Sequence, residues 1–251
     1  MTTRLVETAA GGDFQVVVIA KAPVPGEVKT RLCPPLTHGQ AASLATAALL
    51  DTMEAVSASH AAHRVLALEG PPGSWLLPGF DVVAQRPGEF GARLAGAIDD
   101  AWDRTPLPVL VIGMDTPQVQ GPDLDRAVAP LVRGPADERP RAVLGPAEDG
   151  GYWAIGVRRP VAGMFDGVPM SMSRTRAAQL ERLHALGVSC RVVDGLRDVD
   201  GIDDAVAVAH LAPATRFAAV LAPMTREASI SQTTADLGGN AFGRDPVGHR
   251  G

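Results

Sequence analysis

Short apolar runs rich in β-branched residues alternate with longer helical patterns along most of this chain. Phe14 to Ala20 and Leu107 to Ile112 are nearly continuous apolar segments, as buried parallel strands are. Between them, Thr37 can cap a long Ala/Leu-rich helix at residues 38–58. Strands that alternate with helices predict an α/β fold, a doubly wound and mostly parallel sheet in a three-layer arrangement.

The same patterns predict the remaining elements and the extent of the domain. Further strands are expected at 63–68, 80–84, 141–144, 152–157 and 188–193, and further helices at 89–103, 122–133, 173–187 and 202–211. A chain of 251 residues, 46% of them hydrophobic, can bury one large core, so we predict a single domain at residues 13–212. Residues 1–12 are expected to be a flexible leader. Residues 213–251 lose apolar periodicity and are expected to be a mostly disordered tail, with a short helix near 215–221.

Composition excludes several classes of protein. The net charge of −5 argues against a nucleic-acid-binding protein, and no apolar run reaches the roughly 18 residues of a membrane helix. The first twelve residues lack the apolar segment of a secretory signal. Cys33 and Cys190 are far apart and form no CxxC pattern, so a reduced, cytoplasmic protein is expected.

Lysine is concentrated in one loop. Only two of the 23 basic side chains are lysines, and both lie just after the first strand, Lys21 and Lys29, with Arg31 close by. Gly26 and two prolines shape the loop. Lysine is a compact point charge that suits phosphate neutralisation, so the loop indicates phosphate binding; the alternative is a solvated basic loop. The loop matches neither a Walker A motif nor a dinucleotide-binding fingerprint.

Ligands of doubly wound sheets bind outside the carboxyl ends of the strands. We therefore expect four post-strand segments to converge on one crevice: Lys21 to Arg31, Gln85 to Arg93, Gly113 to Pro117 and Gly145 to Tyr152. Asp115 ends an apolar strand opposite the basic loop, which suits a Mg²⁺–phosphate complex, although it could instead cap a helix. The Gly91–Arg93 segment begins a helix whose N-terminus could hold an anion or a nucleobase edge; a turn with a surface arginine is equally compatible.

Two further acidic segments are candidates for the site. Glu148 and Asp149 precede Gly151 and Tyr152, the only tyrosine, and either acid could act as acceptor ligand or base; an ordinary hairpin turn is the alternative. Four acids precede the last helix, where some must be helix-capping charges, and Asp200 or Asp198 could be a second metal ligand: Leu196-Arg-Asp-Val-Asp-Gly-Ile-Asp-Asp204.

Together, these segments resemble the GT-A-type nucleotide-diphospho-sugar transferase superfamily. Within it they are most similar to a bacterial family of rSAM/selenodomain-associated, or arsenosugar-biosynthesis, glycosyltransferases. That family shows FAKAPVPGxVKTRL, GSDxP, GPAEDGGYYLIG and LRDVDTPEDL, which correspond here to Ile19–Leu32, Gly113–Pro117, Gly145–Gly156 and Leu196–Ala205. The first motif is also similar to the basic loop of 2-phospholactate guanylyltransferases. Three departures stand out: Met114 for Ser or Asp, Gly201-Ile202 for Thr-Pro, and Met170-Ser171 for Trp-Ser.

The resemblance implies a GT-A fold and a metal pair, Asp115 and Asp200, that share Mg²⁺ (or Mn²⁺). With the residue-level reasoning, it assigns nucleotide and phosphate binding to Lys21, Gly26, Lys29, Thr30, Arg31, Gly91 and Arg93. Acceptor binding is expected at Glu148, Asp149, Gly151 and Tyr152, and catalytic roles at Lys29, Asp115 and Asp149. Lys29 is expected to contact phosphate directly, and Lys21 to lie deeper under the nucleotide.

The predicted function is therefore that of a Mg²⁺-dependent transferase with a nucleotide or nucleotide-sugar donor and a small-molecule acceptor. The family resemblance favours glycosyl transfer, in which the donor loses its diphosphate. The basic loop is more typical of nucleotidyl transfer, in which a nucleoside triphosphate reacts with a phosphorylated acceptor and releases pyrophosphate. A third alternative, suggested by Met114, is a nucleotide-binding protein without catalytic activity. The motifs do not specify base, sugar, acceptor or oligomeric state.

Overall fold

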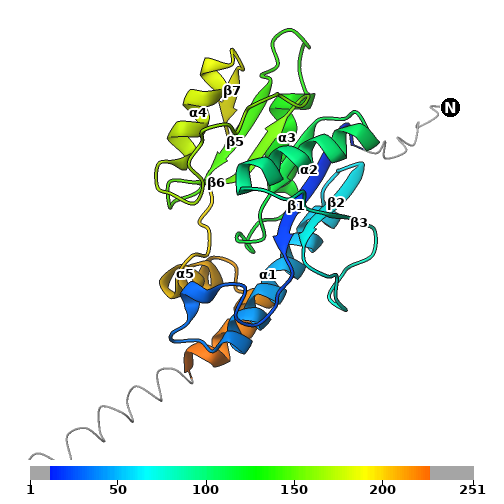
Figure 1. Cartoon of the computed structure of the whole chain (residues 1–251). Coiled ribbons are helices and arrows are strands. Elements are labelled where there is room, and N and C mark those ends of the chain that lie inside the picture. The colour runs from blue at the N-terminus through cyan, green and yellow to red at the C-terminus, as the bar shows by residue number, and fades with distance from the viewer. Residues whose placement is uncertain (1–11, 227–251) are drawn as a thin grey trace, which may run out of the picture.

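The computed structural model describes residues 12–226, in which a seven-stranded sheet lies between two layers of helices (Figure 1). The strand order is β3-β2-β1-β4-β6-β5-β7, and every strand except β6 runs parallel to the others. The strands are β1 Gln15–Lys21, β2 His63–Glu69, β3 Asp81–Ala84, β4 Val109–Ile112, β5 Ala142–Pro146, β6 Tyr152–Val157 and β7 Cys190–Val192. The predicted doubly wound α/β architecture is confirmed.

The helices divide between the two faces of the sheet. Helices α1 and α3 pack on one face, and α2 and α4 pack on the other. Their bounds are α1 His38–Ala58, α2 Phe90–Arg104, α3 Gly121–Val132, α4 Thr175–Ala185 and α5 Ile202–Leu211, with a short 3₁₀ helix η1 at Thr30–Leu32. Thr37 caps α1 as predicted, with its side chain accepting a hydrogen bond from the Gln40 N–H.

Strand β1 shows why the apolar runs are nearly continuous. Val16 and Val18 face the α1/α3 layer, whereas Val17 and Ile19 face the α2/α4 layer. Successive strand residues point to opposite faces, and both faces are covered, so each of these positions is apolar.

The reversed direction of β6 is important for the site. Strands β5 and β6 form an antiparallel hairpin, and Gly145 pairs with Ala154 near its tip. Because β6 runs antiparallel to β4, the hairpin loop lies at the edge where β1 and β4 have their carboxyl ends. This places the acidic loop of the hairpin beside the basic loop that follows β1.

The folded unit extends beyond the predicted end of the domain. Residues 216–226 are helical, and Phe217 and Leu221 pack with α5 and with Leu44 of α1. Asp51 in the middle of α1 accepts hydrogen bonds from the backbone N–H groups of Arg216 (3.1 Å) and Phe217 (2.8 Å). The described fold therefore continues past the predicted boundary at residue 212 and includes a helix where a short one was expected near 215–221. The weak apolar pattern of 213–226 is sufficient because α1 supplies both a cap and a packing surface. The leader at 1–11 and the tail at 227–251 lie outside the described residues.

Within the described part of the chain, none of the helices combines the length and the apolar character that crossing a membrane requires.

We predict that Phe217→Ala lowers the free energy of unfolding by about 3–5 kcal/mol, because its ring is fully buried and its removal leaves a cavity. Leu211→Ala is the matched control, since Leu211 is 69% exposed and should change stability by less than about 0.5 kcal/mol. Urea denaturation of both variants measures the difference. Equal stabilities would show that the last helix is not part of the folded unit.

Candidate active site

A cleft with two adjoining parts lies at the carboxyl edge of the sheet. The first part, here the lysine half, has a volume of about 370 Å³ and is lined by the loop after β1 together with Glu69, Gln85, Arg93 and Asp200. The second part, the tyrosine half, has a volume of about 180 Å³ and is lined by the β5–β6 loop, Tyr152, Met170 and Asp198. Four residues line both halves: Ile19, Phe90, Gly113 and Asp115. The predicted convergence of the four post-strand segments is confirmed.

Lys29 lines the lysine half next to Asp115, which lies between the two halves. Its Nζ lies 2.6 Å from the Asp115 Oδ1 and also donates to the backbone carbonyl of Val199. The Lys29 side chain is only 11% exposed, whereas that of Lys21 is 40% exposed. The expected depths of the two lysines are therefore reversed, because the Lys29 ammonium group is directed inward to Asp115 and the Val199 carbonyl.

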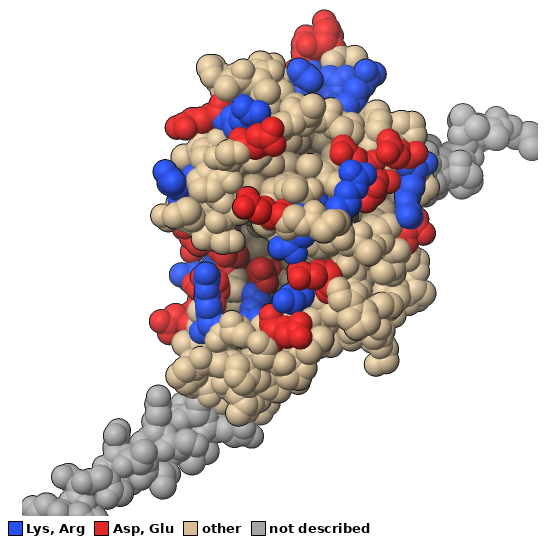
Figure 2. Space-filling view, in the orientation of Figure 1, with Lys and Arg blue, Asp and Glu red and all other residues tan. Residues whose placement is uncertain are grey.

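The other cations of the lysine half also face carboxylates. Arg31 contacts both Asp200 oxygens at 2.6 Å, and Arg93 lies 2.5 Å from Glu69. Lys21 is held more loosely, 4.0 Å from Glu69. Acidic and basic side chains accordingly alternate around the hollow in Figure 2.

Phe90 forms a wall between the two halves. It is the first residue of α2, its side chain lies in both linings, and it is 36% exposed. The Arg93 guanidinium lies 5.3 Å from the ring centroid, within the range of a cation–π contact. Phe90 was not predicted as a site residue, because its helical spacing also fits a core position.

Two predicted nucleotide-binding glycines serve the local structure and do not line the cleft. Gly26 has φ 83°, which side-chain-bearing residues rarely adopt. Gly91 is buried, and a Cβ there would lie 3.2 Å from the Cβ of Phe165. Thr30 does line the lysine half as predicted.

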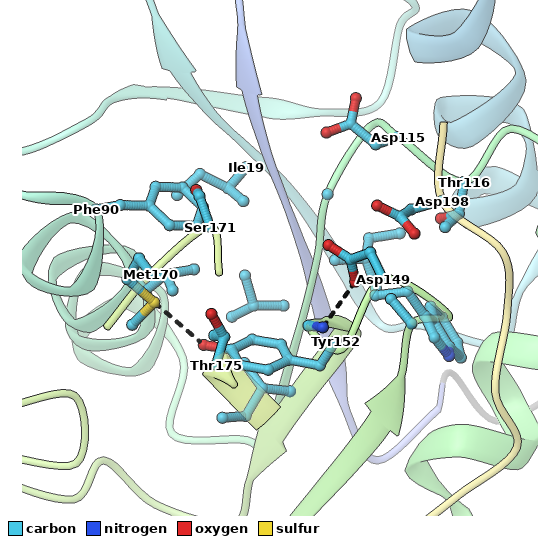
Figure 3. A pocket seen from close by; sticks show the side chains of 18 residues that line it. Ile19, Phe90, Asp115, Thr116, Asp149, Tyr152, Met170, Ser171, Thr175 and Asp198 are labelled. Carbon is cyan, nitrogen blue, oxygen red and sulfur yellow. Dashed lines mark hydrogen bonds between the residues drawn. The ribbon is translucent and has the colours of Figure 1, made fainter. Parts of the chain in front are cut away.

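The β5–β6 loop forms one wall of the tyrosine half. Asp149 accepts a hydrogen bond from the Gly151 N–H at 2.7 Å (Figure 3). Gly150 has φ 91°, and a Cβ there would come within 2.0 Å of the Ser173 carbonyl oxygen, so glycine is required at this position. The Tyr152 hydroxyl donates to the Gln179 Oε1 (3.4 Å), and burial raises the pKa of this phenol, so it stays protonated at neutral pH.

Glu148 lies outside this arrangement. Its carboxylate is 3.2 Å from the Nε of Arg197, and Glu148 is absent from the lining of both halves. Adjacent residues of a tight turn point in different directions, so of the predicted acid pair only Asp149 faces the cleft.

Residues 196–200 cross the cleft as a strap. The Val199 N–H donates to the Asp115 carbonyl at 2.8 Å, and the Gln118 side chain donates to the Arg197 carbonyl. The strap directs Asp198 into the tyrosine half and Asp200 into the lysine half.

This geometry bears on the predicted metal pair. Asp200 is engaged by Arg31, whereas Asp198 shares the tyrosine half with Asp115. Burial, together with the negative charges of Asp149, Asp115 and Asp200, raises the pKa of Asp198 to about 6. Asp115 thus shares the tyrosine half with Asp198 and the lysine half with Asp200, and the second metal ligand stays a prediction at either of these two residues.

The carboxylates of the cleft suit a metal ion that is also bound by groups outside the protein, such as phosphate oxygens. Among residues 12–226, no three or more histidine, cysteine or acidic side chains are grouped as a ready-made metal site. Mg²⁺, however, typically takes one or two carboxylates and completes its shell with phosphate oxygens and water. The linings contain six carboxylates, from Glu27, Glu69, Asp115, Asp149, Asp198 and Asp200, and four cations, from Lys21, Lys29, Arg31 and Arg93. A polyphosphate would add more negative charge, which a divalent cation would compensate.

A family model described as "Uncharacterized protein conserved in bacteria (DUF2064)" matches residues 42–172. The chain belongs to the DUF2064 family. The matched region of this DUF2064 protein contains β4, Asp115 and the β5–β6 loop, whereas the lysine loop precedes it and the strap follows it. No curated protein matches the sequence.

Solved structures share the fold of the DUF2064 protein. A crystal structure from Desulfovibrio desulfuricans G20, described as a candidate nucleotide-diphospho-sugar transferase, matches with a TM-score of 0.76 and 23% identity, over 86% of this chain and 98% of that one. A cytidylyltransferase from Leptospira borgpetersenii serovar Hardjo-bovis (strain JB197) matches with a TM-score of 0.53 and 11% identity, over 94% and 99% of the respective chains. At these identities, the likeness establishes the nucleotide-diphospho-sugar transferase fold.

We predict that Asp198 makes stability depend on pH. Its native pKa of about 6 exceeds the roughly 3.9 of an unfolded aspartate, so the native state binds more protons between these values. The free energy of unfolding should therefore fall as pH rises from about 4 to 6. Asp198→Asn should make this decline smaller, and the part that remains comes from Asp51 and Asp99, whose pKa values burial also raises. Denaturation curves at several pH values measure it.

The matched control is Asp81→Asn, an exposed position on β3 outside both linings, which should retain the wild-type pH dependence. Parallel pH profiles for the wild type and Asp198→Asn would contradict the assignment.

Proposed function

We propose that this DUF2064 protein is a Mg²⁺-dependent transferase that uses a nucleotide donor, and that its reaction is glycosyl transfer from a nucleotide-diphospho-sugar. The observation that carries the proposal is the two-part cleft centred on Asp115, with four cations on one side and an apolar, acidic hollow on the other. Such a division matches a donor that bears phosphates and an acceptor that does not.

The lysine half would bind the donor phosphates. Lys21 is loosely paired, with carboxylates at 3.9 and 4.0 Å, so its ammonium group is available to a phosphate with little rearrangement. Lys29 would reach the phosphates by exchanging Asp115 for a phosphate oxygen. Phe90 offers an exposed ring face at the border of this half, on which a base or a sugar could stack.

Asp115 and Asp198 would hold Mg²⁺, with phosphate oxygens and water as the other ligands. When bound, the metal would stabilise the negative charge that develops on the leaving diphosphate. In the absence of substrate, the ion pair at 2.6 Å would neutralise the charges of Lys29 and Asp115. When Lys29 moves to a donor phosphate, the Asp115 carboxylate would become available to the metal.

Asp149 would act as the base for the acceptor. The acceptor hydroxyl oxygen forms the new bond to the anomeric carbon, and the bond from that carbon to the diphosphate oxygen breaks. The diphosphate leaves with the electron pair of that bond, and Asp149 takes the hydroxyl proton. The Gly151 N–H holds one oxygen of Asp149 in place and leaves the other available for this proton.

Nucleotidyl transfer is the second candidate. The lysine-bearing loop directly after β1, next to Asp115, favours it because a triphosphate would lie along this loop. In this reaction a phosphate oxygen of the acceptor would form a bond to the α-phosphorus of a nucleoside triphosphate. The bond from that phosphorus to the bridging oxygen would break, and pyrophosphate would leave with its electron pair.

We predict that the protein binds nucleotides or nucleotide sugars in a Mg²⁺-dependent manner. Lys29→Ala should weaken binding at least tenfold, because a charge-assisted hydrogen bond contributes roughly 1.5–3 kcal/mol. Asp115→Asn should remove the effect of Mg²⁺, and Asp103→Asn is the control that should leave it unchanged. Calorimetric titration with nucleoside triphosphates and sugar nucleotides, with and without Mg²⁺, measures both effects.

Product analysis separates the chemistries. Release of a nucleoside diphosphate from a sugar nucleotide supports glycosyl transfer, whereas pyrophosphate from a triphosphate supports the second candidate. Binding without turnover across the panel would favour the non-catalytic alternative. If no nucleotide binds, the proposal is wrong in all its forms.

A further inference from the structure

We infer that the acceptor carries no phosphate: it is a neutral or cationic molecule with an apolar body and a hydroxyl or amino group that reaches Asp149. This inference rests on the proposed function and specifies the second substrate of the same cleft.

The charges of the tyrosine half are the first argument. Among residues 12–226, its lining contains three carboxylates, from Asp115, Asp149 and Asp198, and no lysine, arginine or histidine. In Figure 3 these three carboxylates follow one another along one wall of the hollow. A phosphorylated acceptor would therefore meet like charges at close range and would find no cation in this half. A metal at Asp115 would be engaged by the donor.

Arg31 does not change this conclusion. It is close enough to Asp149 for the two charges to interact, but it lines the lysine half and both of its close contacts are to Asp200.

The start of α4, which borders the tyrosine half through Ser171 and Thr175, offers little to an anion. Helix N-termini bind phosphates through free backbone N–H groups. Here the N–H of Thr175 donates to the Met172 carbonyl (2.9 Å), and that of Arg176 donates to the Gly150 carbonyl (3.0 Å).

The opposite wall of the tyrosine half is apolar. Figure 3 shows Phe90, Met170 and the Tyr152 ring across the hollow from the carboxylates. Leu94, Val111 and Ile155 complete this surface. An aromatic or aliphatic body would bury apolar area here, at about 25 cal/mol per Å².

Thr116 supplies a polar contact for an uncharged group. Thr116 is 2% exposed and lines the tyrosine half, and its hydroxyl oxygen is buried without a hydrogen-bond partner within residues 12–226. A buried hydroxyl normally finds a partner, and this one lies beside Asp198 (Figure 3). A hydroxyl or amino group of the acceptor would satisfy it.

A matched pair of probes tests the inference: 4-nitrophenyl β-D-glucopyranoside and the same compound with a 6-phosphate. Saturation-transfer NMR with the full chain, Mg²⁺ and a saturating nucleotide should show at least tenfold tighter binding of the neutral probe. The double variant Asp149→Asn/Asp198→Asn should reduce this preference, while Glu181→Gln, exposed on α4 and outside both linings, should preserve it. Thr116→Val should weaken the neutral probe about two- to tenfold, the effect of one hydrogen bond.

Equal or tighter binding of the phosphorylated probe would overturn the inference, as would an unchanged preference in the double variant or no binding of either probe. Nucleotide binding is measured separately in the same samples. Failure of the proposed function would therefore appear as loss of nucleotide binding, whereas failure of this inference would leave nucleotide binding intact.

Discussion

The contact between Lys29 and Asp115 joins three separate parts of the chain. Lys29 belongs to the loop after β1, Asp115 ends the turn after β4, and the Val199 carbonyl that also accepts from Lys29 belongs to the strap before α5. Because Lys29 is mostly buried, its charge needs a partner, and loss of the carboxylate would leave it uncompensated. The same contact can be exchanged when a donor binds. A phosphate can replace Asp115 as the partner of Lys29, and a cation can replace Lys29 as the partner of Asp115.

The direction of β6 determines the composition of the cleft. In an all-parallel sheet, the loop after β5 would lead into a crossover, and the next strand would start at the opposite edge. The antiparallel hairpin instead returns the chain at once, so Asp149, Gly151 and Tyr152 all lie at the ligand-binding edge. The lysine half and the tyrosine half thus adjoin although their main loops are more than a hundred residues apart.

Local patterns predicted the elements well and the site only in part. The Thr37 cap and the two-sided burial of β1 are properties of neighbouring residues, so their signals are in the sequence. The choice between Asp198 and Asp200 depends on how the strap is held by Val199 and Gln118, which no spacing rule reveals. The resemblance implies Asp200, which lies in the lysine half and is paired with Arg31, and this role stays a prediction. Similarly, the helical spacing of Phe90 also fits a core position, whereas its side chain lines both halves of the cleft.

The sequence by itself determined the alternation of strands and helices, the clustering of both lysines after β1 and the acids that follow β4 and β5, because these follow from chain-local periodicity and composition. Only the tertiary structure decided which charges meet. Lys29 is buried against Asp115, whereas Lys21 is only loosely paired with Glu69. Glu148 contacts Arg197 outside the cleft, and Asp51 of α1 binds the start of the helix at residues 216–226. Such pairings depend on distances between segments far apart in the chain, and those distances exist only once the sheet is assembled.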